Sequence, residues 1–521
     1  MKLIQNIKLT QKAYINDWIP ISLILIVGAV LYFFKIDSFP LETDELYSVY
    51  DAKELKIFYY RPFYFILLNI WMHLSTDEGW LRSLAVLFGL GSIFLTYQLG
   101  RRLSGETIGL ISAILIALSP MLIGSAQQVR MYTLGNFLTL AGSLALTYVL
   151  EKTTAKMIAF WAVSRFLSLL TIPLSVTILV PDFILIVTGL RKQHDKLFKV
   201  LASLLGIAIL WIPFAILLVT TKSYYESTWG EDTSPPSIIQ VVRNLKFFTF
   251  WPGRVPSNQL LSNFHRVFTA VLALLLGIAL FRKHRNSQLL WLAAWLFLPL
   301  LSLILISNFH SLELLPRYLV FTAPFLFILL TAGFIKVWQS QRTFGIVLTI
   351  GYFIAVGSGV INHYSDSSVA DWRGANLEIS RNEQPQDAIA VSIPHGRVCP
   401  FITHYYQGNI PIYGLSQLRG EVTEQELDDF VQSLPTSQPR TWLLFRKAFK
   451  GTFKDLEVAL SKKYSILQQQ AFSGGIKVFL LEARLLNSQL QSAVPSQFSV
   501  TALNCVRTPQ VLLFKSLDEK S

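Results

Sequence analysis

The sequence predicts an α-helical polytopic membrane protein with about eleven transmembrane helices and a small α/β domain at its C-terminal end. Of the 521 residues, 52% are hydrophobic and only 15% are charged, which is typical of chains that cross a bilayer many times. Apolar segments of roughly 20 residues, the length that spans the hydrocarbon core, recur from Trp18 to Val360. After Val360, short apolar runs alternate with helical patterns.

The apolar segments are limited by charged residues, glycine and proline. The segment within Met157–Leu190 is interrupted by Pro173 and Pro181, so we interpret it as a hairpin of two crossings. The other predicted crossings are Trp18–Phe34, Trp80–Leu99, Thr107–Ile123, Tyr132–Leu150, Val200–Thr220, Phe264–Phe281, Leu289–Ile306, Tyr318–Ile335 and Phe344–Val360.

Basic residues gather in alternate connections, for example at Arg101-Arg102 and Arg191-Lys192. Cytoplasmic loops carry such an excess of Lys and Arg, so the pattern predicts a cytoplasmic N-terminus and an extracytoplasmic C-terminal domain. This topology accounts for the net charge of +13, and no nucleic-acid-binding motif is present. We therefore expect membrane lipids as partners and no nucleic acid. The lack of an endoplasmic-reticulum retention signal favours a multi-pass protein of the bacterial inner (plasma) membrane.

The first extracytoplasmic loop, about 35–79, carries two adjacent carboxylates, Asp44 and Glu45. Ionisable groups at a membrane boundary are costly to desolvate and usually mark a site or a pairing partner. The alternative is that these acids only keep the loop in water. The aromatic run Phe58–Leu74 is too short to cross, and both an interfacial helix and a re-entrant helix fit it.

Residues 1–360 are thus predicted to form a membrane domain of many spans, and residues 361–521 an extracytoplasmic accessory domain with a tail. In the second, the runs Ala388–Ile393, Thr441–Phe445 and Ile476–Leu481 predict strands, and Thr423 with Glu426 has the spacing of a capping box. This domain contains no phosphate-binding loop and no metal-ligand spacing. Its two cysteines, Cys399 and Cys505, could form a disulfide in an oxidising compartment, but we expect two free thiols.

A series of short motifs runs in order through residues 40–375. They are Thr43-Asp44-Glu45-Leu46-Tyr47-Ser48, Arg61-Pro62-Phe63-Tyr64, Trp80-Leu81-Arg82-Ser83-Leu84, Leu99-Gly100-Arg101-Arg102-Leu103, Ala117-Leu118-Ser119-Pro120, Gln128-Val129-Arg130-Met131-Tyr132, Pro316-Arg317-Tyr318-Leu319 and Asp371-Trp372-Arg373-Gly374. In this order they resemble motifs of the GT-C superfamily of glycosyltransferases. The similar branch holds the protein O-mannosyltransferases, the aminoarabinose transferases and the RgtA/B/C/D-like proteins.

The resemblance implies the GT-C fold and a mannosyltransferase-like activity. Such an enzyme transfers a single sugar from a polyprenyl-phosphate donor, with inversion, on the extracytoplasmic side. The acceptor is a glycan, a lipid or a protein. The resemblance further implies that Asp44 is the general base, which accepts the proton of the attacking hydroxyl. Glu45 would orient Asp44 or the acceptor, and its alternative role is a helix-capping or solvated carboxylate.

Arg130 and Arg317 stand at the predicted outer ends of two spans, within motifs that match the family. Arginine binds phosphate in a planar fork and stays charged, so both are candidates to clamp the donor phosphate. Arg61 and Arg82 are further candidates on the same side. The alternative for such residues is contact with lipid headgroups.

The candidate contacts to the sugar or acceptor are Tyr47, Tyr64, Gln128 and Tyr132. Aromatic rings stack on sugar faces, although an interfacial belt is the alternative for the tyrosines. The first loop contains no Asp-x-Asp motif and the histidines share no spacing, so we expect no metal or other cofactor.

Two other functions remain open. The first is a transporter or flippase of lipid-linked saccharides. Transporters often show internal repeats and charges near the membrane centre, and neither is evident in the sequence. The second is a glycan ligase of the same superfamily, which differs from the proposed transferase in the length of the glycan on its donor.

Overall fold

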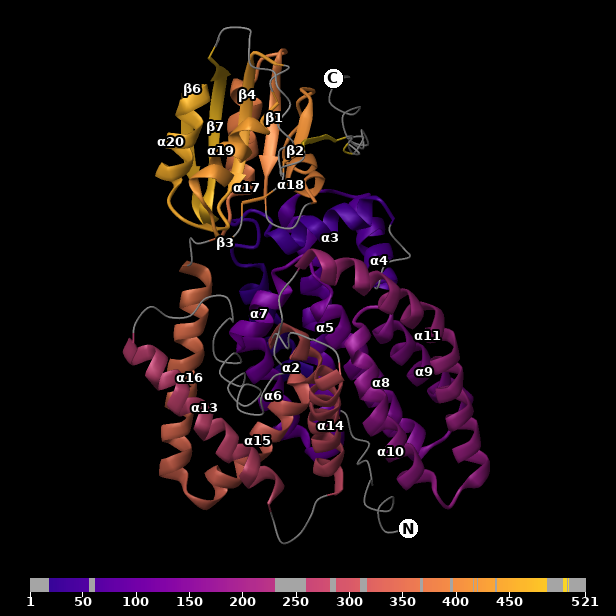
Figure 1. Ribbon diagram of the computed structural model, residues 1–521. Coiled ribbons are helices and arrows are strands. Elements are labelled where there is room, and N and C mark those ends of the chain that lie inside the picture. The colour runs from indigo at the N-terminus through magenta and orange to yellow at the C-terminus, as the bar shows by residue number, and fades with distance from the viewer. Residues whose placement is uncertain are drawn as a thin grey trace, which may run out of the picture. The chain divides into compact units, whose positions relative to one another are not determined.

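The computed structural model describes residues 18–55, 61–229, 259–281, 287–309, 316–365, 369–393, 397–415, 417–418, 420–435, 438–484, 500–503 and 505. Its contacts divide the chain into two compact units. The helical unit comprises Met1–Ile36 and Leu55–Asp366, and the sheet unit comprises Asp37–Glu54 and Ser367–Ser521. The predicted fold class, a polytopic helical membrane protein with a C-terminal α/β domain, is confirmed (Figure 1).

Within the described residues, eight helices are long and apolar enough to cross a membrane, or nine when one bent pair is counted. The expected number of about eleven is higher because α2 (Trp18–Phe33) and α9 (Ala155–Leu169), with 16 and 15 residues, are shorter than a full span. The long spans are α5 (Glu78–Ser104), α8 (Tyr132–Glu151), η2 with α10 (Pro173–Ile178 and Leu179–Leu190), α11 (His194–Trp229), α13 (Gln259–Leu280), α14 (Ser287–Phe309), η4 with α15 (Pro316–Thr322 and Ala323–Ser340) and α16 (Arg342–Ser365).

The bent pair consists of α6 (Glu106–Leu118) and α7 (Pro120–Ala126), which meet at 64°. Pro120 has no N–H to continue α6, and it holds Ser119 in an extended conformation (φ −65°, ψ 120°). The bend therefore directs the chain into the turn that precedes α8 and carries Gln128 and Arg130.

A buried ion pair joins the two arms of the predicted hairpin, which is α9, η2 and α10. Arg165 and Asp182 have no exposed surface, and Nε and Nη2 of Arg165 lie 2.7 and 3.0 Å from the two carboxylate oxygens. The indole N–H groups of Trp161 and Trp295 also donate to Asp182, each at 2.8 Å. Two further N–H groups of the guanidinium donate to the carbonyl of Thr139 and the hydroxyl of Ser143 in α8, at 2.7 and 2.8 Å. The pair thus links α8, α9, α10 and α14, which places these helices side by side (Figure 1).

The short helix α4 (Pro62–Met72) has 11 residues, which agrees with a segment too short to cross a bilayer. The rings of Trp71 and Trp80 stack at 4.6 Å between centroids. Each indole N–H donates to the carbonyl of the other residue, at 2.9 and 3.0 Å. These contacts fix the end of α4 against the start of α5. The choice between an interfacial and a re-entrant helix stays open.

The sheet unit contains a six-stranded sheet in the order β6-β7-β4-β1-β2-β8, in which β1 is parallel to β2 and β4. The strands are β1 (Asp387–Ser392), β2 (Ile412–Leu415), β4 (Arg440–Arg446), β6 (Tyr464–Phe472), β7 (Ile476–Ala483) and β8 (Val500–Ala502). The three apolar runs predicted as strands correspond to β1, β4 and β7. A separate short pair joins β3 (Gly420–Glu421) and β5 (Phe449–Lys450).

Both faces of the sheet are covered at its central strand, since all six residues of β1 are buried. The apolar sides of α19 (Glu424–Gln432) and α20 (Phe453–Lys463) pack with Leu443, Phe445 and Phe479 in one core. Thr423 and Glu426 form the predicted capping box at the start of α19. The other helices of the unit are α3 (Thr43–Lys53), α17 (Trp372–Asn382), α18 (Cys399–Thr403) and the turn η5 (Ser473–Gly475).

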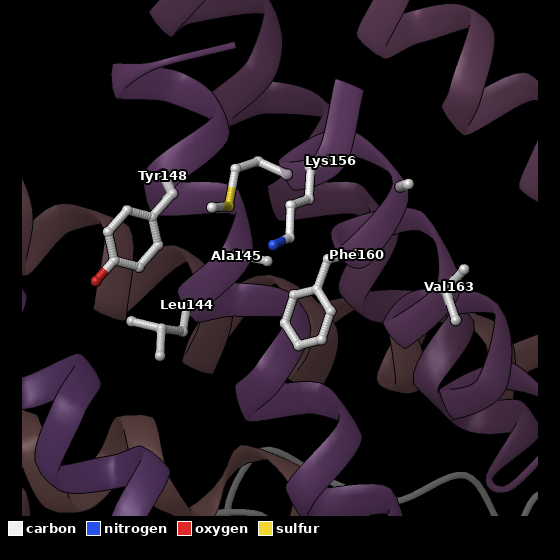
Figure 2. A pocket seen from close by; sticks show the side chains of 8 residues that line it. Leu144, Ala145, Tyr148, Lys156, Phe160 and Val163 are labelled. Atoms are coloured by element: carbon white, nitrogen blue, oxygen red, sulfur yellow. The ribbon is translucent and has the colours of Figure 1, made fainter. Parts of the chain in front are cut away.

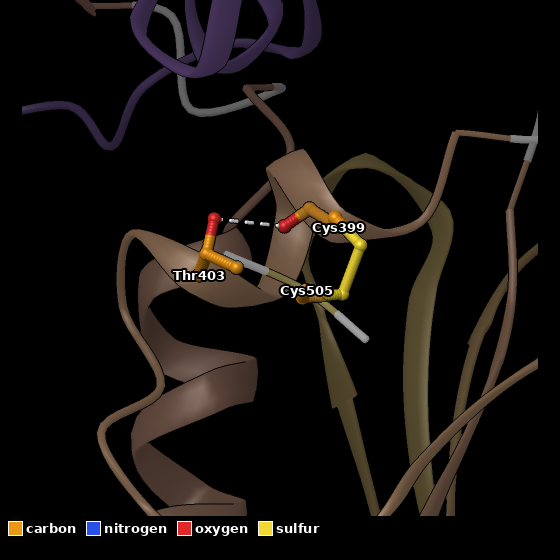
Figure 3. The surroundings of a disulfide bond; sticks show 3 residues. All are labelled: Cys399, Thr403 and Cys505. Carbon is orange, nitrogen blue, oxygen red and sulfur yellow. Dashed lines mark hydrogen bonds between the residues drawn. A yellow bond between two sulfur atoms is a disulfide. The ribbon is translucent and has the colours of Figure 1, made fainter. Parts of the chain in front are cut away.

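Cys399 and Cys505 form a disulfide, so the expectation of two free thiols is wrong (Figure 3). Cys399 begins α18, and Cys505 follows β8. Because β8 pairs with β2 at the edge of the sheet, strand pairing brings the two cysteines together across 106 residues of sequence. The disulfide ties α18 to this edge.

We predict that Asp182→Asn lowers the free energy of unfolding in detergent by about 3–5 kcal/mol, because it leaves the buried Arg165 without its counter-charge. The midpoint of thermal unfolding measures this loss. Asp195→Asn, at an exposed position in the first turn of α11, is the matched control and leaves the midpoint unchanged. An unchanged midpoint in Asp182→Asn would contradict a structural role for the pair.

Candidate active site

Asp44 and Glu45 lie in the first turn of α3, where the positive end of the helix dipole favours negative charge. The Oε2 atom of Glu45 accepts the N–H of Glu42 at 2.8 Å, in the manner of a capping box. Glu45 is 1% exposed, whereas Asp44 is half-buried. The structure thus shows the capping contact that was the alternative role of Glu45, and its catalytic role stays a prediction.

Tyr47 lies one turn after Asp44, on the same face of α3. Its ring meets Phe401 edge to face at 5.4 Å between centroids. The hydroxyl group of Tyr47 is buried and makes no hydrogen bond to the described residues. Burial raises the pKa of this phenol, so it remains protonated near neutral pH and offers an O–H donor beside Asp44.

Gln128, Arg130 and Tyr132 come together at the start of α8 in the helical unit. The N–H of Arg130 donates to the carbonyl of Gln128 at 2.7 Å, and the guanidinium lies 5.7 Å from the centre of the Tyr132 ring. Tyr132 is 1% exposed, and its hydroxyl makes no hydrogen bond within the described part of the chain. Arg317 lies in η4, which packs against α8, although its side chain is outside the described residues. The backbone therefore brings the elements of both predicted clamp residues together.

Arg61, Tyr64 and Arg82 lie on α4 and α5, away from the turn that carries Gln128 and Arg130 in the sequence. Arg61 is the N-cap residue of α4, and Tyr64 is buried one turn later beside the ring of Phe65 at 5.9 Å. Arg82 is 3% exposed, and its Nη1 donates to the carbonyl of Ile36 at 2.7 Å. Arg82 therefore ties the chain that leaves α2 to α5.

The predicted site residues are thus divided between the two units. Asp44, Glu45 and Tyr47 belong to the sheet unit, and the arginines with Tyr64, Gln128 and Tyr132 belong to the helical unit. The predicted approach of the acid to the guanidinium groups stays a prediction. The described residues contain no group of three His, Cys, Asp or Glu side chains suited to a metal ion, and the expected metal independence also remains to be tested.

Three residues that form hydrogen bonds to α3 or to the residues just before it were missed by the sequence analysis. They are Arg397, Tyr405 and Arg446, all from the C-terminal part of the sheet unit. Each is more than 340 positions away from its partner in α3 or in the residues just before it. Spacing along the sequence carries no signal over such a distance.

An apolar groove of about 500 Å³ lies between α8 and α9, lined by Leu144, Tyr148, Met157 and Phe160 with Lys156 among them (Figure 2). Leu144 is 12 positions beyond Tyr132 in the same helix, so the groove is roughly 18 Å along the axis from the candidate residues. It lies between two helices of the helical unit and contains none of the predicted site residues.

The fold is similar to that of ArnT from Cupriavidus metallidurans. The crystal structure of the apo state aligns with 89% of this chain and 98% of that chain, with a TM-score of 0.58 and 13% identity. The structure bound to undecaprenyl phosphate aligns with 90% and 98%, with a TM-score of 0.57 and 12% identity. The chain thus has the GT-C fold that its motifs implied. No family model matches the sequence, and no curated protein matches it.

We predict that Glu45→Ala accelerates hydrogen exchange of the first-turn amides of α3 about fivefold, because losing the capping contact costs on the order of 1 kcal/mol. Glu45→Gln is the matched control, since an amide oxygen caps the same N–H without the charge. Mass-spectrometric hydrogen exchange measures both variants. Equal exchange in Glu45→Ala and the wild type would rule out the capping role.

Proposed function

We propose that the chain is an integral-membrane glycosyltransferase. It moves a single sugar from a polyprenyl-phosphate donor to an acceptor on the extracytoplasmic face, with inversion at the anomeric carbon. The observation that carries this proposal is the fold similarity to ArnT, which extends over 98% of that chain and includes a structure bound to undecaprenyl phosphate. A helix that presents Asp44 in its first turn supplies the carboxylate that such a reaction needs as its base.

In this mechanism Asp44 is the general base. The acceptor oxygen attacks the anomeric carbon and gives its proton to the Asp44 carboxylate, while the bond between that carbon and the phosphate oxygen breaks. The lipid phosphate leaves with the bonding electrons. Because the attack is a single displacement from the opposite side, the configuration inverts.

The departing phosphate gains negative charge in the transition state, and fixed guanidinium groups stabilise such charge. Arg130 and Arg317 are the proposed clamp, which is supported by the packing of η4 against α8. Arg61 and Arg82 are the second candidates for binding the phosphate. Arg82 also donates a hydrogen bond to the carbonyl of Ile36. Tyr47, Tyr64, Gln128 and Tyr132 are the proposed contacts to the sugar or acceptor.

The proposal puts the N-terminus in the cytoplasm and the sheet unit outside, from the distribution of Lys and Arg. The proposed membrane is a bacterial plasma membrane. It requires no metal ion, since a carboxylate base and guanidinium groups supply the proton acceptor and the positive charge. The acceptor is a glycan, a lipid or a protein.

We predict that Asp44→Asn lowers turnover at least ~10²-fold while donor binding is retained, because the amide cannot accept the proton. Purified full-length protein in liposomes, with EDTA present, receives polyprenyl-phosphate sugars and candidate acceptors. Asp37→Asn, an exposed acid seven positions earlier, is the matched control and keeps wild-type turnover. Wild-type turnover in Asp44→Asn would remove this residue from the mechanism.

The same liposomes distinguish the other functions. A flippase moves a labelled lipid-linked saccharide between leaflets without forming a new glycosidic bond. A ligase uses only a donor with a preassembled glycan. Either result in the wild type replaces the proposed reaction.

Arg130→Ala and Arg317→Ala are each predicted to weaken donor binding about tenfold or more and to lower turnover, because each removes a charge-assisted contact to phosphate. Equilibrium binding of a fluorescent polyprenyl-phosphate sugar measures the first effect. Arg342→Ala, at the exposed start of α16, is the control and binds normally. Normal donor binding in both test variants would refute the clamp.

A further inference from the structure

The C-terminal part of the sheet unit contacts the N-terminal end of α3 directly. The hydroxyl of Tyr405 accepts the N–H of Leu41 at 2.7 Å, just before the helix begins. Nη1 of Arg446 donates to Oγ1 of Thr43 at 2.8 Å, one position before Asp44. Arg446 is itself held against the ring of Trp372, 5.6 Å from its centre. The residues that lead into the Asp44 turn are therefore bound by two side chains of the sheet unit, one at the backbone N–H of Leu41 and one at the hydroxyl of Thr43.

Arg397 binds the other end of the same helix. Its two terminal nitrogens face the two oxygens of Asp51, with Nη1 at 3.3 Å from Oδ2 and Nη2 in close contact with Oδ1. The guanidinium also lies over the rings of Tyr47 and Tyr50, at 5.0 and 5.7 Å from their centres. A planar fork that pairs with a carboxylate and stacks on aromatic rings fixes both distance and orientation.

The ion pair of Arg397 with Asp51 matters for the stability of α3 because Asp51 is nearly inaccessible to solvent. Asp51 is 6% exposed, so removal of Arg397 takes a positive charge away from a buried carboxylate, which is costly. Asp44, Tyr47 and Asp51 are spaced by three and four residues and therefore share one face of α3. A rotation of the helix that relieved Asp51 would also turn Asp44.

Arg397 and Tyr405 come from one segment, 397–405, which contains Phe401 and the five-residue helix α18. A helix of that length is not stable alone. The Cys399–Cys505 disulfide joins the segment to the chain that follows β8 (Figure 3). This covalent link therefore supports the residues that hold α3.

We propose that Arg397 is a positioning residue: together with Arg446 and the disulfide-linked segment 397–405, it fixes the orientation of the helix that presents Asp44. The inference rests on the proposed role of Asp44 as the base. It assigns to the sheet unit a part in the reaction, although none of these residues touches the substrate.

The first test uses the full-length protein in liposomes and compares Arg397→Ala with Arg381→Ala, an exposed arginine of α17. Arg397→Ala is expected to accelerate hydrogen exchange along α3 and to lower kcat between about 10- and 100-fold with the donor KM unchanged, since misplacement of a reacting group has this effect. Arg381→Ala leaves both unchanged. Arg397→Lys retains the charge but not the fork, so it folds and gives an intermediate kcat.

The exchange and kinetic readings separate the two proposals. Wild-type exchange in α3 of Arg397→Ala, or a wild-type kcat in an active preparation, overturns the positioning role. Faster exchange in this variant, with a wild-type protein that transfers no sugar, refutes the proposed function and leaves the structural contact in place. The double variant Arg397→Asp/Asp51→Arg swaps the two charges. If the ion pair is what slows hydrogen exchange in α3, this variant recovers part of the protection that Arg397→Ala loses.

The disulfide gives a test that leaves Arg397 intact. The double variant Cys399→Ser/Cys505→Ser is expected to accelerate exchange in both α18 and α3 and to lower kcat in the same direction as Arg397→Ala. Wild-type exchange in α3 of this variant would remove the disulfide from the proposal.

Discussion

The position of the proposed base depends on contacts that α3 makes within the sheet unit. An isolated helix of 11 residues is unstable in water, so α3 takes its stability from its caps and its neighbours. Glu45 caps its first turn, and the ion pair of Arg397 with Asp51 holds its second half. A general base must meet its proton within hydrogen-bond reach, which requires a fixed helix. The α/β unit is therefore more than an accessory if Asp44 is the base.

Local features of the fold were predictable because they follow from hydropathy over short stretches. In the described residues, the segments predicted as crossings are helical, and the three apolar runs predicted as strands belong to one sheet. The number of full spans was overestimated because Trp18–Phe33 and Ala155–Leu169 are apolar but short. The bend at Pro120 was also missed, since the segment is apolar on both sides of the proline.

Contacts between distant parts of the sequence were not predictable in the same way. The pairing of Cys399 with Cys505 follows from strand pairing at the sheet edge, and the sequence around either cysteine does not indicate that pairing. The partner of Asp51 is 346 positions away, and many basic residues of the sequence were equally possible partners. The acidic pair itself was identifiable, because ionisable groups at a membrane boundary are costly to desolvate and usually mark a site or a pairing partner. The residues that surround this acidic pair could be identified only from the folded structure.

Low identity with a shared fold has a physical reason in a protein of this kind. Many apolar sequences satisfy the length and polarity of a span, so a membrane fold persists while its residues change. The fold therefore leaves the chemistry undecided. Polar groups carry more information. Inside the helical unit, Arg165 and Asp182 are fully buried, pair with each other and form hydrogen bonds with groups of α8, α9 and α14, as expected for a pair that stabilises packing. Asp44 instead lies half-buried in the first turn of a short helix that other residues hold in place. That contrast, rather than the fold alone, is the reason to look for the reaction at Asp44.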